Sequence, residues 1–314
     1  MNADFVNAVS ELLKMGGRDL VEKDFLIHSL LFDLSRNNYF RSNFLLKGGT
    51  CLIKCHLGYF RFSEDMDFTW GEQSVFNGIS QKEIRRKLSA AIEKVGDILE
   101  EIAARHGMDF KCRKADRNYV ELVGSDKSAT FKVWYDSMVL KRKTFLKIQI
   151  NFVDLLLFAP VDKELASLFS ALGDDEGKNL RPLFEKEFDA YSERPKLAVY
   201  DVREIFCEKA RSILTRRSVK ARDFLDLYLI SAKFGLDPGE FKAEITAKIR
   251  FVLGMYERYR SNFEEKKKLL KSGAFFEWGN ERELLIQKID ENKFHVFLNE
   301  IKSPLLEIVD NVSS

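Results

Sequence analysis

The stretch LLKGGTCLIKCHLGYFRFSEDMDFTW, residues 45–70, decides both the local fold and the functional argument. A short apolar run leads into Gly48-Gly49-Thr50 and then into a helical segment. Residues 65–70 alternate between polar and apolar side chains, as β-strands do. The stretch therefore predicts a strand, a glycine turn, a helix and a second strand.

The glycine turn has the properties of a phosphate-binding loop. Two glycines allow a positive φ and a close approach of the backbone to a ligand. The first N–H groups of the following helix point outward at the positive end of its dipole, which suits a phosphate. Thr50 adds a hydroxyl donor, and Lys54 lies one turn further along the same helix. We therefore expect this turn to bind the phosphates of a nucleotide.

Asp65 and Asp67 predict a metal site. At positions i and i+2 of a strand, both carboxylates face the same way. Two close carboxylates repel each other unless a cation lies between them, and Mg²⁺ prefers oxygen ligands that it shares with substrate phosphates. A glycine turn or a pair of aspartates alone is usually structural. Their joint occurrence favours a site for a nucleoside triphosphate and a metal.

These residues resemble the AbiEii/AbiGii toxin family, pol-β-like nucleotidyltransferases of toxin–antitoxin and phage-abortive systems. The resemblance rests on LLKGGTCLIK and RFSEDMDF, with further matches in FLKIQINF (145–152) and EIFCEKARSILTRRSVKARDFLDLYLI (204–230). It covers roughly residues 20–235. It implies an α+β fold, in which helices flank the mixed β-sheet of a pol-β-like core and a helical C-terminal domain follows.

The resemblance also implies roles for individual residues. Lys209 matches a lysine expected to contact the nucleotide phosphates, and Asp223 matches an aspartate expected in the active site. Asp226 is either functional or a carboxylate facing a helix N-terminus. The expected catalytic residues are Asp65, Asp67, Lys209 and Asp223. The expected metal ligands are Asp65 and Asp67, and the expected nucleotide-binding residues are Gly48, Gly49, Thr50, Lys54, Arg61, Ser63, Lys209 and Asp226.

One position departs from the pattern of this fold, which often places a third carboxylate on a later strand. In FLKIQINF the candidate positions hold Gln149 and Asn151, which are neutral amides. Either the third carboxylate is dispensable, or Asp154 or Asp223 supplies it, or catalysis is weakened. Because an amide cannot act as a general base, activation of the attacking hydroxyl would rest on Asp67.

Composition limits the possible classes of protein. The 314 residues include 51 Lys and Arg against 49 Asp and Glu, so the chain is not a polycation. Local charge is uneven: the window 203–222 holds seven basic and two acidic residues, as in a solvated helix face or a site for triphosphate or RNA. Without a leader-like start, an apolar run of membrane-spanning length or a disulfide framework, we expect a cytoplasmic protein with no membrane partner.

The expected domains are a nucleotidyltransferase core over residues 1–160 and a mainly helical domain over 161–314 that completes the active-site cleft. Periodicity predicts a helix over 80–106, strands over 108–114, 119–123, 130–136 and 144–152, and mostly helix after 162. Trp134 is expected in the core.

The expected reaction transfers a nucleoside monophosphate from an NTP to an acceptor, with Mg²⁺ or Mn²⁺ as cofactor. By resemblance, the acceptor is the 3′ end of tRNA or a protein side chain, and a cognate antitoxin neutralises the toxin. Two other classes stay open: a non-catalytic nucleotide-binding module that signals, and a nucleotidyltransferase acting on a small molecule such as an antibiotic. Oligomeric state is not predicted.

Overall fold

The computed structural model describes residues 2–14, 17–124, 126–172, 179–255 and 257–313. It divides into two compact units. Unit 1 comprises residues 1–154 and 160–200, and unit 2 comprises residues 155–159 and 201–314. This division falls later than the boundary expected near residue 160, because residues 160–200 add two strands to the sheet of unit 1.

Unit 1 is built on a seven-stranded mixed sheet in the order β3-β4-β5-β2-β1-β7-β6. Two neighbouring pairs, β2–β5 and β1–β7, are parallel, and the other pairs are antiparallel. The strands are β1 (Phe44–Lys47), β2 (Asp65–Trp70), β3 (Val120–Val123), β4 (Ser128–Asp136), β5 (Lys143–Asn151), β6 (Val161–Glu164) and β7 (Lys196–Val199).

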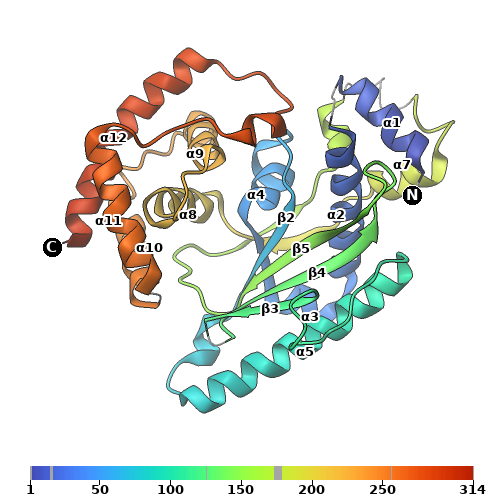
Figure 1. Ribbon diagram of the computed structural model, residues 1–314, viewed down its shortest axis with the longest axis horizontal. Helices are drawn as coiled ribbons and strands as arrows, with labels where there is room; N and C mark the ends of the chain where they lie inside the picture. The colour runs from blue at the N-terminus through green and yellow to red at the C-terminus, as the bar shows by residue number, and fades with distance from the viewer. Residues whose placement is uncertain (1, 15–16, 125, 173–178, 256, 314) are drawn as a thin grey trace. The chain divides into compact units, whose positions relative to one another are not determined.

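Helices flank this sheet, and α2 passes behind β4 and β5 in the view of Figure 1. The long helix α5 begins with a capping box, in which Ser80 and Glu83 bond each other's backbone N–H. The helices of unit 1 are α1 (Ala3–Leu12), α2 (Arg18–Arg36), α3 (Asn38–Asn43), α4 (Gly48–Cys51), η1 (Leu52–Leu57), η2 (Gln73–Phe76), α5 (Gln81–Arg105), η3 (Leu168–Ala171) and α7 (Glu185–Ser192).

The sheet has one apolar and one polar face. Met66 and Phe68 of β2 share the apolar face with Ile148 and Ile150 of β5, and all four are buried. Phe40 of α3 packs edge-on against Phe68, with 4.8 Å between ring centroids. Each such fully buried side chain stabilises the fold by about 1.5–3 kcal/mol. The apolar face therefore forms the core of unit 1.

The residues that alternate with these along each strand place their side chains on the opposite side of the sheet, which we call the polar face. Its members follow from strand alternation and from the register of β2, β4 and β5. They are Asp65, Asp67 and Thr69 of β2; Phe145, Lys147, Gln149 and Asn151 of β5; and Ser128, Thr130, Lys132 and Trp134 of β4. Trp134 is therefore half-buried on this face rather than in the core.

Unit 2 is helical in its described residues apart from connecting loops. Its helices are α8 (Val202–Thr215), α9 (Ala221–Phe234), α10 (Lys242–Met255), α11 (Glu257–Ser272), η4 (Asn280–Leu284) and α12 (Glu291–Ser313). Gly235 adopts a left-handed conformation directly after α9, as a helix terminator does. The mixed α+β class and the helical C-terminal region are thus confirmed.

Two sequence-based predictions of secondary structure are wrong. Residues 108–114 form no strand, because only Asp109 pairs with β4, while Cys112 and Lys114 bond Glu100 and Ser89 of α5. The mostly helical structure expected after residue 162 is continuous only from α8 onward, because β6 pairs with β7 and β7 pairs with β1 before it.

Candidate active site

Gly48 is fixed by its conformation and by its neighbour. It has a φ of +72°, which side chains disfavour. A Cβ atom at this position would lie 2.5 Å from Oδ2 of Asp67. Lys47 and Asp67 are cross-strand partners in β1 and β2. Gly48 therefore brings the backbone of the turn directly against one of the two predicted metal ligands.

The space for a side chain at Gly49 is limited by neighbours other than Asp67. The φ of this glycine is not positive, so the left-handed conformation expected for the glycine pair belongs to Gly48 alone. A Cβ atom on Gly49 would lie 2.9 Å from Nη2 of Arg61 and 3.0 Å from Oγ of Ser63. Arg61 is buried, and its Nη1 donates to the carbonyl oxygen of Phe62 at 2.7 Å. Arg61 and Ser63 thus lie beside the turn, as the sequence analysis expects of nucleotide-binding residues.

Thr50 connects the turn to the start of β2. Its hydroxyl bonds the backbone carbonyl of Asp65 and lies 2.9 Å from Oγ of Ser63. Since Thr50 is only 1% exposed, this hydroxyl does not point into solvent. The expected role as a phosphate donor is replaced by a positioning role, because the proton is already donated to the residue that carries the first carboxylate.

Asp65 and Asp67 lie on the polar face two residues apart, as predicted. The side chain of Asp65 is 30% exposed, and Nζ of Lys147 lies 3.8 Å from its Oδ2. In the described part of the chain, no group of three or more His, Cys, Asp or Glu side chains could hold a metal ion. A cation here would have two protein carboxylates and would need further oxygen ligands from substrate or water.

The β5 position expected to carry a third carboxylate holds an amide, Gln149. Gln149 is the direct neighbour of Asp67 across the parallel β2–β5 pair. Asp154, one proposed substitute, has its Oδ2 bonded by Nζ of Lys47 at 2.6 Å and by the hydroxyls of Thr69 and Tyr200, each at 3.0 Å. Because these groups already satisfy and neutralise that oxygen, Asp154 fits a structural role better than a metal-binding one.

Lys54 belongs to a buried cluster rather than to the phosphate turn. Its Nζ lies 3.1 Å from Oδ1 of Asp24 and bonds the hydroxyl of Tyr59, and Tyr191 bonds the same carboxylate. Burial lowers the pKa of Lys54, and the charge of Asp24 opposes this effect. The lysine is 3% exposed and connects η1 to α2. Lys54 therefore holds η1 against α2 instead of facing the phosphate turn.

The candidate residues of unit 2 form one buried ion cluster. Nζ of Lys209 lies 2.8 Å from Oδ1 of Asp223 and 2.6 Å from Oδ2 of Asp226, and Nη1 of Arg216 lies 2.9 Å from Oδ2 of Asp223. Burial raises the pKa of Asp223, but the charges of Lys209 and Arg216 outweigh it and hold this pKa below its ordinary value. The cluster joins α8 to α9. Its placement relative to Asp65 and Asp67 stays a prediction.

The basic window of residues 203–222 is largely compensated by acidic neighbours. Arg203 pairs with Asp201, Arg211 with Glu208, and both Lys220 and Arg222 with Glu281. These acidic partners are only 16–17% exposed, so the pairs neutralise the window within the protein, which counts against a polyanion site there. Two further lysines, Lys47 and Lys147, lie beside Asp67 and Asp65 in the register of the sheet, and only that register, not the local sequence pattern, reveals them.

The family of the chain follows from its sequence as a whole. The family described as "Nucleotidyl transferase AbiEii toxin, Type IV TA system" matches residues 29–307, which span unit 1 and unit 2. The chain belongs to the AbiEii family. Its members are nucleotidyl transferase toxins of type IV toxin–antitoxin systems, which implies a cognate antitoxin.

Two solved structures from Helicobacter pylori are similar to this AbiEii chain. The structure of JHP933 covers 95% of this chain and 96% of its own, with 14% identity and a TM-score of 0.44. That of a putative nucleotidyltransferase covers 94% and 97%, with the same identity and TM-score. Among curated proteins, none matches the sequence. In the residues that the structure describes, no helix is long and apolar enough to cross a membrane.

Proposed function

We propose that this AbiEii-family chain transfers a nucleoside monophosphate from an NTP to an acceptor hydroxyl and releases pyrophosphate, in the presence of Mg²⁺ or Mn²⁺. One observation carries the proposal. Asp65 and Asp67 share the polar face of β2, and the turn at Gly48 approaches Asp67 so closely that a Cβ atom would lie 2.5 Å from its carboxylate. A phosphate bound at the turn would therefore lie beside both carboxylates.

The donor set fits a hard divalent cation. Both candidate ligands are carboxylates, and Mg²⁺ prefers oxygen atoms that it shares with substrate phosphates. When bound by Asp65 and Asp67, the metal would supply positive charge to the phosphate oxygens and the leaving group. Gln149 could contribute only a neutral amide next to Asp67.

The chain's own residues would perform the remaining tasks. Backbone N–H groups of the Gly48-Gly49 turn would bind the triphosphate, with Arg61 and Ser63 beside it. Thr50 holds the backbone of Asp65 in place. Asp67 would accept the proton of the attacking hydroxyl. Lys209, Asp223 and Asp226 stay candidates by family resemblance, for contact with the nucleotide or for supporting it.

The acceptor and the antitoxin belong to the proposal as well. We propose the 3′ end of tRNA or a protein side chain as the acceptor class, in a cytoplasmic protein that a cognate antitoxin neutralises. Gln149 in place of a third carboxylate favours one rival class, a nucleotide-binding module without transfer activity.

Incubation of the protein with each labelled NTP, Mg²⁺ and either total RNA or total protein tests the proposal. We expect label in one acceptor class, and loss of labelling with EDTA and in Asp65→Asn or Asp67→Asn. The matched control is Asp162→Asn, which removes an exposed carboxylate from β6 of the same sheet. NTP binding without transfer would support the rival class, and full transfer by both active-site variants would contradict the site.

A further inference from the structure

The polar face continues beyond the two aspartates into a region with a different character. Toward the β4–β5 hairpin it carries Phe145 and Trp134, both half-buried. Their rings pack together with 4.9 Å between centroids. Lys132 Nζ lies 5.9 Å from the centroid of Phe145. Two aromatic rings on the solvent-facing side of a sheet, rather than on its core side, need a separate explanation.

The aromatic pair lies close to the candidate catalytic aspartates. Phe145 precedes Lys147 by two residues on β5, and Lys147 is the direct neighbour of Asp65. Two residues along a strand span about 7 Å. A planar group stacked on Phe145 or Trp134 would therefore lie roughly one nucleotide's length from Asp65.

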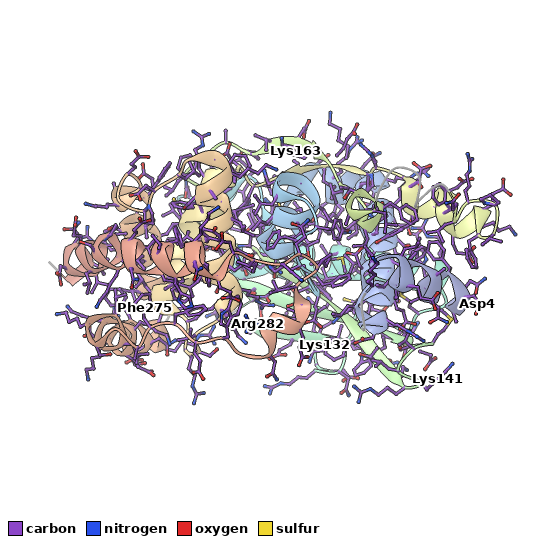
Figure 2. All side chains as sticks on the ribbon, turned by 90° about the horizontal axis from the view of Figure 1, so that it is seen from above. Asp4, Lys132, Lys141, Lys163, Phe275 and Arg282 are labelled. Atoms are coloured by element: carbon purple, nitrogen blue, oxygen red, sulfur yellow. The ribbon has the colours of Figure 1, made fainter. Side chains whose placement is uncertain are left out.

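Basic loops border this region. Residues 109–117 and 140–143 together contain seven basic and two acidic residues, in a chain whose net charge is only +2. Trp134 Nε1 donates to the carbonyl oxygen of Asn118 at 2.7 Å, and Lys132 Nζ donates to that of Arg117 at 3.0 Å, so the first loop lies at the rim of the aromatic pair. Figure 2 shows Lys132 and Lys141 on the side of the molecule opposite Lys163.

The lysines of this region have carboxylate partners that a phosphate could replace. Lys132 pairs with Glu121 at 3.5 Å and Lys143 with Asp109 at 2.6 Å, and these carboxylates are 48% and 40% exposed. Ion pairs this exposed contribute little to stability. Replacing such a carboxylate with a phosphate of a nucleic-acid backbone therefore costs little free energy. The positive charges of Lys132 and Lys143 are thus available to a polyanion.

We propose that this part of the polar face binds a single-stranded RNA and directs its end toward Asp65 and Asp67. Trp134 and Phe145 would stack with bases, as aromatic residues on sheets do for single-stranded nucleic acids. Lys132 and the two basic loops would contact phosphates, and the half-buried Gln149 would offer a hydrogen bond to a 2′-hydroxyl group. The inference rests on the proposed function, because it identifies the acceptor of that reaction as RNA rather than protein.

Binding is tested without NTP, by anisotropy of a fluorescent single-stranded RNA oligonucleotide of mixed sequence with the full-length protein. We expect Trp134→Ala and Phe145→Ala to raise Kd by roughly 5- to 150-fold, the range for losing one stacked base, and Trp134→Tyr to restore most of the affinity. The control Tyr39→Ala removes a half-buried aromatic from α3, on the apolar side of the sheet, and should leave Kd unchanged. NTP affinity should be the same in all these variants.

Salt dependence tests the charged part of the surface. Lys132→Gln should lower the slope of log Kd against log salt by about 0.7, the value for one phosphate contact with a single strand. Lys163→Gln, on the opposite side, should not change it. Equal affinity for DNA of the same sequence, for duplex RNA, or for the Trp134→Ala variant would overturn the inference.

The two proposals fail in different ways. If the protein labels RNA but Trp134→Ala binds and labels it like the wild type, the surface is wrong and the reaction stands. If the protein labels only protein and does not bind the oligonucleotide, the RNA surface is also overturned. If the oligonucleotide binds through Trp134 and Phe145 but no NTP yields a labelled product, the surface stands and the proposed reaction fails.

Discussion

Single atoms connect the phosphate turn to the two aspartates. The missing side chain of Gly48 leaves space for the carboxylate of Asp67, and the hydroxyl of Thr50 bonds the backbone of Asp65. Each contact links one residue of the turn to one predicted metal ligand. Small changes in the turn should therefore alter the geometry of the carboxylates before they affect the rest of the sheet.

Gly48→Ala should impair transfer far more than folding. The added Cβ would meet Oδ2 of Asp67 at 2.5 Å and displace it, and such misplacement costs roughly a hundredfold in rate. Gly78→Ala is the matched control, because Gly78 has a φ of +70° but nothing within 4 Å of an added Cβ. Both variants should lose about 1–2 kcal/mol of unfolding free energy from the left-handed conformation. Equal transfer rates in the two variants would disprove the proposed closeness of turn and carboxylate.

Thr50→Val should lower both stability and transfer, while Thr50→Ser should retain them. Valine keeps the shape but removes the hydroxyl, which leaves the carbonyl of Asp65 without this donor, at a cost of about 1–3 kcal/mol. Urea unfolding and steady-state labelling measure the two effects. A valine variant that labels acceptor at the wild-type rate would show that Thr50 does not position Asp65.

At the scale of elements, a buried polar network attaches η1 to α2. Asp24 and His28 of α2 meet Lys54 of η1 and Tyr191 of α7. The pKa of His28 is lowered from 6.5 to about 4, mainly by burial and next by the charge of Lys54. This network holds the helix that directly follows the phosphate turn.

His28 predicts a specific pH dependence of stability. Its folded pKa lies below its unfolded pKa, so the unfolded chain binds more protons between about pH 4 and 6.5. The free energy of unfolding should therefore fall as the pH drops through this window, by up to about 3 kcal/mol. His28→Gln should flatten the slope in urea unfolding. If the wild type and His28→Gln show the same slope of unfolding free energy against pH, other titrating groups cause that slope.

Helices and strands could be predicted from the sequence where the local apolar pattern favours the same structure as the long-range pairing. The helix over 80–106 matches α5, and the strands over 130–136 and 144–152 match β4 and β5 closely, because apolar periodicity decides them. The local pattern failed for 108–114 and for residues 160–200, whose conformations depend on distant partners in α5 and β1. At the site, it predicted correctly that Asp65 and Asp67 share one face of a strand, and their metal-binding role stays a prediction. It did not predict that Lys54 is buried against Asp24, because helical spacing does not reveal which face is buried.

At the scale of the whole molecule, each unit has its own charged cluster. In unit 2, Lys209→Met should destabilise the fold by about 3–5 kcal/mol, since Asp223 and Asp226 would lose a buried partner. Hydrogen exchange should increase in α8 and α9 while β2 stays protected. Lys271→Met, on the exposed side of α11, is the control. Near-normal stability with loss of transfer would instead assign Lys209 to catalysis.

The strand order of unit 1 also has a consequence for synthesis on the ribosome. β1 reaches its final parallel neighbour only when β7, some 150 residues later in the chain, has left the exit tunnel. Until then the nascent sheet has a row of β1 backbone groups without their strand partner, which invites pairing with other chains. A fragment that stops near residue 160 should therefore aggregate, whereas one that extends through Tyr200 contains every strand of the sheet and should be soluble on expression.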